Sequence, residues 1–139
     1  MENLFINASK DPNGLTEELV KQRLNIDQYE TINLVEYMIY PLGQEMRPGD
    51  QFKTVCDQVK QAHTIIVGTP VYWSSMSAYM KILIDRMTQV MGPNNPFAGK
   101  DLYLIIDGME PSDTIQHVTH VWEHVAGRFD MQLVKVVHN

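Results

Sequence analysis

At 139 residues, 44% of them hydrophobic and 20% charged, the chain has the size and composition of one globular domain, residues 1–139. Its net charge of −6, with Lys and Arg scattered, argues against a nucleic-acid partner, and no apolar run is long enough to cross a membrane. The single cysteine excludes an internal disulfide or a cysteine-ligated cluster within one chain, and the N-terminus lacks a secretory pattern, so we expect a cytoplasmic protein that binds small molecules.

Strands and helices alternate along the predicted chain. Short apolar runs predict strands, and apolar residues at three-and-four spacing predict helices. In chain order we predict a strand at residues 4–7, a helix at 14–24, a strand at 31–37, a loop at 40–49, a helix capped by Asp50, a strand at 64–68, a long helix ending at Met91, a strand at 102–106, a helix at 112–129 and a strand at 131–137. The side chains expected on or near the inner side of the first helix are Leu15, Leu19 and Leu24. Those expected on the inner face of the long helix are Met76, Tyr79, Met80, Leu83, Ile84 and Met87.

This alternation predicts a three-layer α/β domain with right-handed crossovers. For a chain of this size the expected parallel sheet has the flavodoxin-like strand order 2-1-3-4-5. The last helix is expected to be short or absent, and a partner subunit is one way to cover the sheet face left bare. Ligands of such sheets bind over the carboxyl ends of strands one, three and four, which here lead into the loops 8–16, 69–77 and 107–113.

The first of these loops joins a strand to a helix and has the composition of a phosphate site. Hydroxyl, amide and small residues can surround a phosphate at a helix N-terminus. The residues of this kind are Ser9, Asn13, Gly14 and Thr16. A simple capped turn explains the same residues, because Asn-Gly and Thr-Glu-Glu also begin helices. Asp11, Glu17 and Glu18 add negative charge that Lys10 only partly offsets.

The second and third loops offer an aromatic wall and a glycine. Tyr72 and Trp73, with Pro70 and Ser74 beside them, suit a flat ring ligand whose edge bonds to the backbone. Alternatively the two aromatic rings only cover the end of the sheet. Gly108 in the third loop either lets the backbone approach such a ring or makes an ordinary turn before the next helix.

Two further residue types invite a chemical interpretation. His117, His120 and His124 share one helical face opposite the apolar one, and a solvated or interface face explains them better than zinc. Cys56 holds an inward helical position and is expected to be a small buried apolar residue. The G-x-S-x-G pattern of a hydrolase nucleophile is missing from the sequence.

Over nearly its whole length the chain resembles the NAD(P)H-dependent FMN reductases of the flavodoxin-like fold. That family often shows a strand, the letters GTPVYW, small residues and a helix with Lys and Asp-Arg. The residues that match in place are Gly68 to Trp73, Lys81, Asp85 and Arg86.

The family's first loop resembles GSPRxNGNT and holds the phosphate of FMN. The matching residues are Ser9, Asn13, Gly14 and Thr16. Ala8 stands where the family has Gly, and Asp11 stands where it has Arg. The iron–sulfur branch of the family carries several cysteines before the third strand, whereas this chain has only Cys56, so no such cluster is implied.

The resemblance implies FMN as the cofactor and NAD(P)H as the co-substrate. The residues it implies around FMN are Ser9, Lys10, Asn13, Gly14, Leu15, Thr16, Pro70, Val71, Tyr72, Trp73, Ser74 and Gly108. A hydride would pass through the flavin to a quinone, a second flavin or another small acceptor, with no side chain acting as acid or base. Members of the family are usually dimers or tetramers, so a homodimer or homotetramer is expected. The alternatives are a non-catalytic relative that has lost FMN and serves as a binding or assembly module, and a flavodoxin-type electron carrier.

Overall fold

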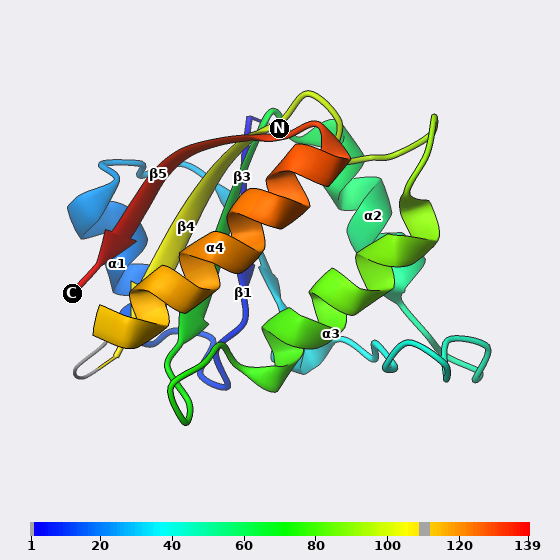
Figure 1. Cartoon of the computed structure of the whole chain (residues 1–139), viewed down its shortest axis with the longest axis horizontal. Helices are drawn as coiled ribbons and strands as arrows, with labels where there is room; N and C mark the ends of the chain where they lie inside the picture. The colour runs from blue at the N-terminus through cyan, green and yellow to red at the C-terminus, as the bar shows by residue number, and fades with distance from the viewer. Residues whose placement is uncertain (1, 109–111) are drawn as a thin grey trace.

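The computed structural model describes residues 2–108 and 112–139, which form alternating strands and helices (Figure 1). The strands are β1 (Asn3–Asn7), β2 (Glu30–Asn33), β3 (Thr64–Pro70), β4 (Asp101–Asp107) and β5 (Gln132–His138). The helices are α1 (Leu15–Arg23), α2 (Phe52–Gln61), α3 (Ala78–Met87) and α4 (Ser112–Phe129), with short 3-10 helices η1 (Leu34–Glu36) and η2 (Thr88–Val90). Among the described helices, none combines the length and apolarity that crossing a membrane requires.

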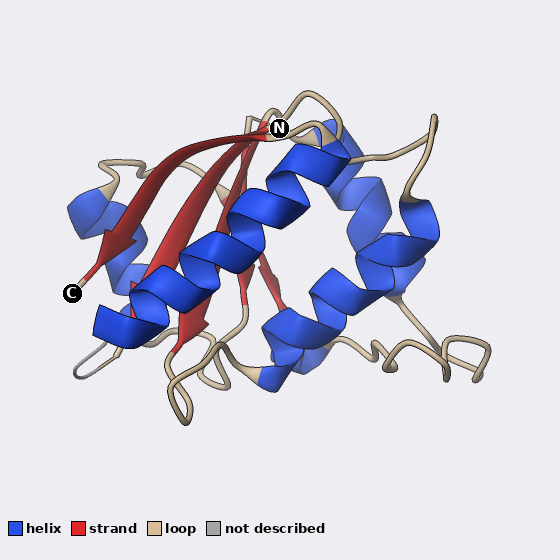
Figure 2. Cartoon of the chain, viewed as in Figure 1, coloured by secondary structure: helices blue, strands red, loops and turns tan. Residues whose placement is uncertain are grey.

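The five strands form one parallel sheet in the order β2-β1-β3-β4-β5, which confirms the predicted fold class. Figure 2 shows the helices lying against both faces of this sheet. The central strands are apolar on both faces because helices cover both, as parallel sheets require. On one face α1 packs on Phe5, Ile66 and Ile105, and on the other α2, α3 and α4 enclose the larger core. No further helix follows β5 in residues 132–139.

The prediction of a strand over residues 31–37 is wrong after Asn33. β1 ends at Asn7, which pairs with Asn33, so a longer β2 would have no neighbouring strand to bond to. The chain instead turns into η1, and this turn buries Leu34 in the core. Alternation along the sequence does not reveal where the neighbouring strand stops.

Two predicted inward positions are exposed in the structure, and a third is buried but lies outside its predicted helix. α3 begins at Ala78 because the Ser77 side chain caps it, accepting the backbone N–H of Met80. Met76 therefore precedes the helix, although it is buried, and Tyr79 is 37% exposed. The α-helix also ends earlier than Met91, with η2 completing the segment. On α1, Leu15 is 64% exposed.

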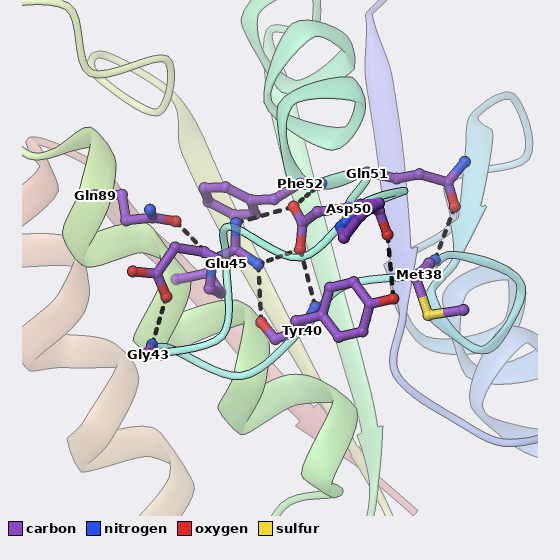
Figure 3. Close-up of polar contacts among 10 residues, drawn as sticks. Met38, Tyr40, Gly43, Glu45, Asp50, Gln51, Phe52 and Gln89 are labelled. Carbon is purple, nitrogen blue, oxygen red and sulfur yellow. Dashed lines mark hydrogen bonds and ion pairs between the residues drawn. The ribbon is translucent and has the colours of Figure 1, made fainter.

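A buried ion pair fastens the long loop before α2 to α3 (Figure 3). Arg86 donates to both carboxylate oxygens of Asp50, at 2.6 and 2.9 Å, and to the backbone oxygen of Tyr40 at 2.8 Å. Asp50 also accepts the backbone N–H groups of Tyr40 and Phe52, so it bonds to the first residue of α2, but the N-cap position that was predicted for it belongs to Gln51. The Arg86 guanidinium lies 4.8 Å from the centre of the Phe52 ring. These contacts hold the pKa of the Asp50 carboxyl at about 2, chiefly through the hydrogen bond from Arg86.

Candidate cofactor site at the carboxyl edge of the sheet

The three predicted ligand loops meet at the carboxyl ends of β1, β3 and β4. The backbone N–H of Ala8 donates to Gly68 at 2.8 Å, and the Ser77 hydroxyl donates to the Ala8 backbone oxygen at 2.7 Å. Val71 donates its N–H to the backbone oxygen of Asp107 at 2.9 Å. Loops that are far apart in sequence therefore form one hydrogen-bonded rim.

The first loop keeps hydrogen-bond donors free for a ligand. The backbone N–H of Asp11 donates to the hydroxyl oxygen of Ser9 at 3.0 Å, which leaves the Ser9 hydrogen without an acceptor among the described residues. Gly14 is the N-cap of α1 with no side-chain cap, and the first backbone bond runs from Glu18 to Gly14. The N–H groups that precede Glu18 in the helix are thus open to an anion.

Asn7 gives this loop its shape, and sequence reasoning missed it. Its buried side-chain oxygen accepts the backbone N–H of Ser9 at 3.0 Å, while its amide nitrogen donates to Asn33 at 3.0 Å. The same nitrogen reaches the backbone oxygens of Asp11 and Pro12 at longer range. The sequence signal that could have identified Asn7 is its position as a polar residue at the end of the apolar strand β1.

Gly68 allows α1 to approach the sheet. A Cβ at this position would lie 2.7 Å from the Thr16 methyl group and 2.9 Å from the Phe5 ring. Any larger residue would push Thr16 away from β3, so the glycine of the GTPVYW motif sets how closely the start of α1 approaches the sheet.

The second loop is a tight hairpin turn that displays its aromatic residues. Tyr72 and Ser75 exchange backbone hydrogen bonds of 2.9 and 3.1 Å, and the two residues between them have left-handed φ values, +52° for Trp73 and +62° for Ser74. Such φ values strain residues other than glycine. Trp73 is 100% exposed and Tyr72 is also exposed, so Trp73 does not cover the sheet end, and that alternative interpretation is wrong for it.

In the third loop, Gly108 makes room for a neighbouring side chain of the protein. A Cβ on it would lie 2.6 Å from the Cβ of Val71, so the two predicted site residues are in direct contact. Neither of the two interpretations of this glycine, approach to a ring or an ordinary turn, anticipated that packing. The rest of the predicted loop includes residues 109–111, which lie outside the described residues, as does the side chain of Ser112.

The remaining predicted residues surround this rim. Pro70 is half-buried at the end of β3, and Ser74 is exposed in the hairpin. Lys10 and Asn13 are exposed, and Lys10 pairs with Asp11 at 3.3 Å. Exposed Leu15 begins α1 beside them.

A carboxylate that sequence reasoning did not select stands inside the rim. Asp107 ends β4, and one of its oxygens accepts the hydroxyl of Thr16 at 3.3 Å. Burial raises the pKa of Asp107, the hydrogen bond from Thr16 opposes that rise, and the charge of Glu18 adds to it. The sequence signal for Asp107 is a charged residue that directly follows the apolar run 102–106. Its hydrogen-bond partner Thr16 lies 91 residues earlier, and spacing along the chain does not reveal that contact.

The two residue types considered for other chemistry lie elsewhere. His117, His120 and His124 are exposed on α4, and His120 and His124 border a groove of about 400 Å³ between α3 and α4. Within residues 2–108 and 112–139, no group of three His, Cys, Asp or Glu side chains is arranged to hold a metal ion. Cys56 is buried as predicted, and burial raises the pKa of its thiol to about 11.

Residues 1–138 match the family described as NADPH-dependent FMN reductase. The chain belongs to this family. The match covers the whole rim, including the first loop in which Ala8 and Asp11 depart from the family's pattern.

Individual relatives agree with this membership. A Bacillus subtilis protein named as an NAD(P)H-dependent FMN-containing oxidoreductase is 28% identical over 99 residues, covering 66% of this chain and 54% of its own. An iron–sulfur flavoprotein of Methanocaldococcus jannaschii is 32% identical over 99 residues, covering 62% of this chain and 51% of its own. The chain thus spans about half the length of the curated relatives it matches. The solved structure of the Trp repressor binding protein from Bacillus subtilis has a TM-score of 0.78 and 25% identity, covering 99% of this chain and 85% of that one.

Proposed function

We propose that this chain binds FMN at the carboxyl edge of its sheet and acts as an NAD(P)H-dependent oxidoreductase. The observation that carries the proposal is the joining of an uncapped helix N-terminus and an exposed aromatic hairpin in one hydrogen-bonded rim. The first suits a phosphate and the second suits a flat ring. Family membership supplies the reason to choose FMN.

The phosphate side would rest on the first loop. The open N–H groups of α1 and the hydroxyl of Ser9 are donors, as a phosphate needs, and Thr16 lies in the same turn with its hydroxyl directed to Asp107. Asn13 is exposed at the same loop, and exposed Lys10 would have to leave its pair with Asp11 to reach the ligand.

The ring side would rest on the hairpin. Pro70 and Val71 lead the backbone to the rim, and Tyr72, Trp73 and Ser74 present aromatic surface and polar groups there. The strained turn holds Trp73 outward before any ligand arrives, so little reorganisation is needed on binding. Gly108 supports this side indirectly, through its contact with Val71.

Bound FMN would supply the redox chemistry, accepting a hydride from NAD(P)H and reducing a quinone, another flavin or a similar small acceptor. The chain's own residues would bind and orient the cofactor, with no side chain serving as acid or base. A homodimer or homotetramer fits the exposure of Trp73, which a second copy beside the ring would reduce.

Titration of the purified protein with FMN tests the proposal, followed by absorbance and by quenching of flavin fluorescence. Binding that weakens in Trp73→Ala and in Ser9→Ala supports the two halves of the site. Oxidation of NADH or NADPH in the presence of a quinone then tests the activity.

The second candidate is a family member that has lost FMN and serves as a binding or assembly module. Asp11 and Asp107 favour it, since both place negative charge near the phosphate side. A colourless protein that takes up no FMN at high concentration would support this candidate and exclude the oxidoreductase.

A further inference from the structure

The hydrogen bond between Thr16 and Asp107 occupies a donor that the phosphate side needs. Thr16 is buried in the first turn of α1, and its single hydroxyl hydrogen is directed to the Asp107 carboxylate at 3.3 Å. A hydroxyl has one hydrogen to donate, so Thr16 cannot donate to Asp107 and to a phosphate at the same time.

The surroundings of Asp107 are negative on the helix side. From α1, Glu18 acts on it by charge, and Glu17 lies in the same first turn. From β5, the exposed His138 pairs in register with Ile106, one residue before Asp107. From the loop after β3, the backbone N–H of Val71 donates to the backbone oxygen of Asp107 and not to its carboxylate, whose other oxygen accepts the Asn139 amide at 3.1 Å.

We propose that Asp107 couples FMN binding to the uptake of a proton. This inference rests on the proposed function and concerns the phosphate side of the same site. A phosphate dianion arriving at the N-terminus of α1 would add charge beside a carboxylate that is already half-buried. Like charges disfavour each other strongly where water is limited, so the protonated form of Asp107 is favoured in the complex.

Protonation of the Asp107 carboxyl also reverses the direction of its hydrogen bond with Thr16. A neutral Asp107 donates its O–H to the Thr16 oxygen, and Thr16 then has its own hydrogen free for the phosphate. One proton moves from solvent to a carboxylate oxygen of Asp107, and no covalent bond to the ligand forms or breaks. The raised pKa of Asp107 in the free protein is consistent with this, because less free energy is then needed to protonate it.

The test compares wild-type protein with Asp107→Asn, an uncharged variant that keeps a hydrogen-bonding side chain. The dissociation constants of FMN and of riboflavin, which lacks the phosphate, are measured from pH 5.5 to pH 8.5. We expect Asp107→Asn to bind FMN about tenfold more tightly than wild type at pH 8, with the ratio shrinking toward one at low pH. The titration of the phosphate itself affects both proteins and cancels in this ratio.

Riboflavin and a second carboxyl variant provide the controls. Riboflavin affinity is expected to stay within about twofold in Asp107→Asn, since the effect requires the phosphate. Asp101→Asn removes the same charge at the opposite end of β4 and should leave the FMN dissociation constant unchanged. Calorimetry of FMN binding at one pH in buffers of different ionisation enthalpy should show net proton uptake that is larger in wild type than in Asp107→Asn.

Each outcome decides the matter. Equal FMN affinity of wild type and Asp107→Asn at pH 8, or equal proton uptake, overturns the role of Asp107 while leaving FMN binding intact. If wild type binds neither FMN nor riboflavin, the proposed function itself fails. Should Asp107→Asn not fold, Asp107→Ser removes the same charge, and it must show the same gain in FMN affinity over wild type at pH 8.

Discussion

Arg86 and Asp50, 36 residues apart, form a two-pronged ion pair that is almost completely buried. Arg86 belongs to the Asp-Arg step of the motif that begins at Gly68, yet it contacts the loop before α2 and lies away from the rim of the candidate site. Asp85, the other residue of the Asp-Arg step, pairs with Lys81 on the exposed face of α3. The motif therefore combines a part that shapes the site with a part that holds the fold together.

Removing Arg86 should destabilise the protein strongly. Arg86→Met leaves the Asp50 carboxylate buried without its partner, and we expect the free energy of unfolding to fall by about 3–5 kcal/mol. Urea denaturation at pH 7 measures the change. Lys81→Met breaks the exposed pair with Asp85 on the same helix and should cost no more than about 0.5 kcal/mol. Equal losses in the two variants would contradict the role given to Arg86.

The same ion pair should make stability fall in acid. Folding lowers the pKa of Asp50 from 3.8 to about 2, so its contribution is complete above pH 4 and is lost as the pH falls toward 2. The difference between the unfolded and folded pKa values of Asp50 corresponds to about 2 kcal/mol in the free energy of unfolding. Urea midpoints of wild type and Asp50→Asn between pH 4.5 and pH 2 measure it, and the two curves should converge toward low pH. Parallel curves over that range would show that Asp50 is not the titrating group.

The hairpin turn should show opposite effects on stability and on binding. Trp73→Gly relieves the left-handed strain and is expected to stabilise the protein by about 1 kcal/mol, while it removes the proposed ring contact and should weaken FMN binding. Thermal denaturation and FMN titration give the two readings. Trp73→Ala keeps the strain and should weaken FMN binding equally without any gain in stability. A loss of stability in both variants would mean that Trp73 packs against its own chain.

The contact between Gly108 and Val71 predicts a size limit. A methyl group at position 108 would lie within 2.6 Å of Val71, so Gly108→Ala should cost about 1–3 kcal/mol and displace the hairpin. Gly127→Ala is the matched control, because that exposed helical position has open space and should gain about 0.5–1 kcal/mol. Chemical denaturation of the two variants measures the difference. An unchanged free energy of unfolding in Gly108→Ala would contradict the close contact between Gly108 and Val71.

Much of the fold could be predicted because it depends on local patterns. The apolar runs of β3 and β4 and the three-and-four spacing of Met80, Leu83 and Met87 in α3 indicate their elements without any partner. The end of β2 could not be predicted, since it depends on β1 stopping at Asn7.

The candidate site also has parts that could be predicted from the sequence and parts that could not. Its loops follow from the strand order, and Thr16 could be named because it sits at a helix start. The contact of Thr16 with Asp107, and that of Val71 with Gly108, join segments brought together only by folding. Spacing along the chain does not reveal such contacts, and they alter the charge and the available space at the site.

The two tryptophans of the chain have opposite surroundings. Trp73 is wholly in water at the tip of the hairpin, whereas Trp122 is buried and donates its indole N–H to the sulfur of Met80 at 3.3 Å. We therefore expect their intrinsic emission to separate into a red-shifted component that iodide quenches and a blue-shifted one that iodide does not reach. The first component reports what comes to lie beside the hairpin, and the second reports whether α3 and α4 remain packed together. The protein thus carries two built-in optical probes, one for occupancy of its rim and one for the integrity of its core.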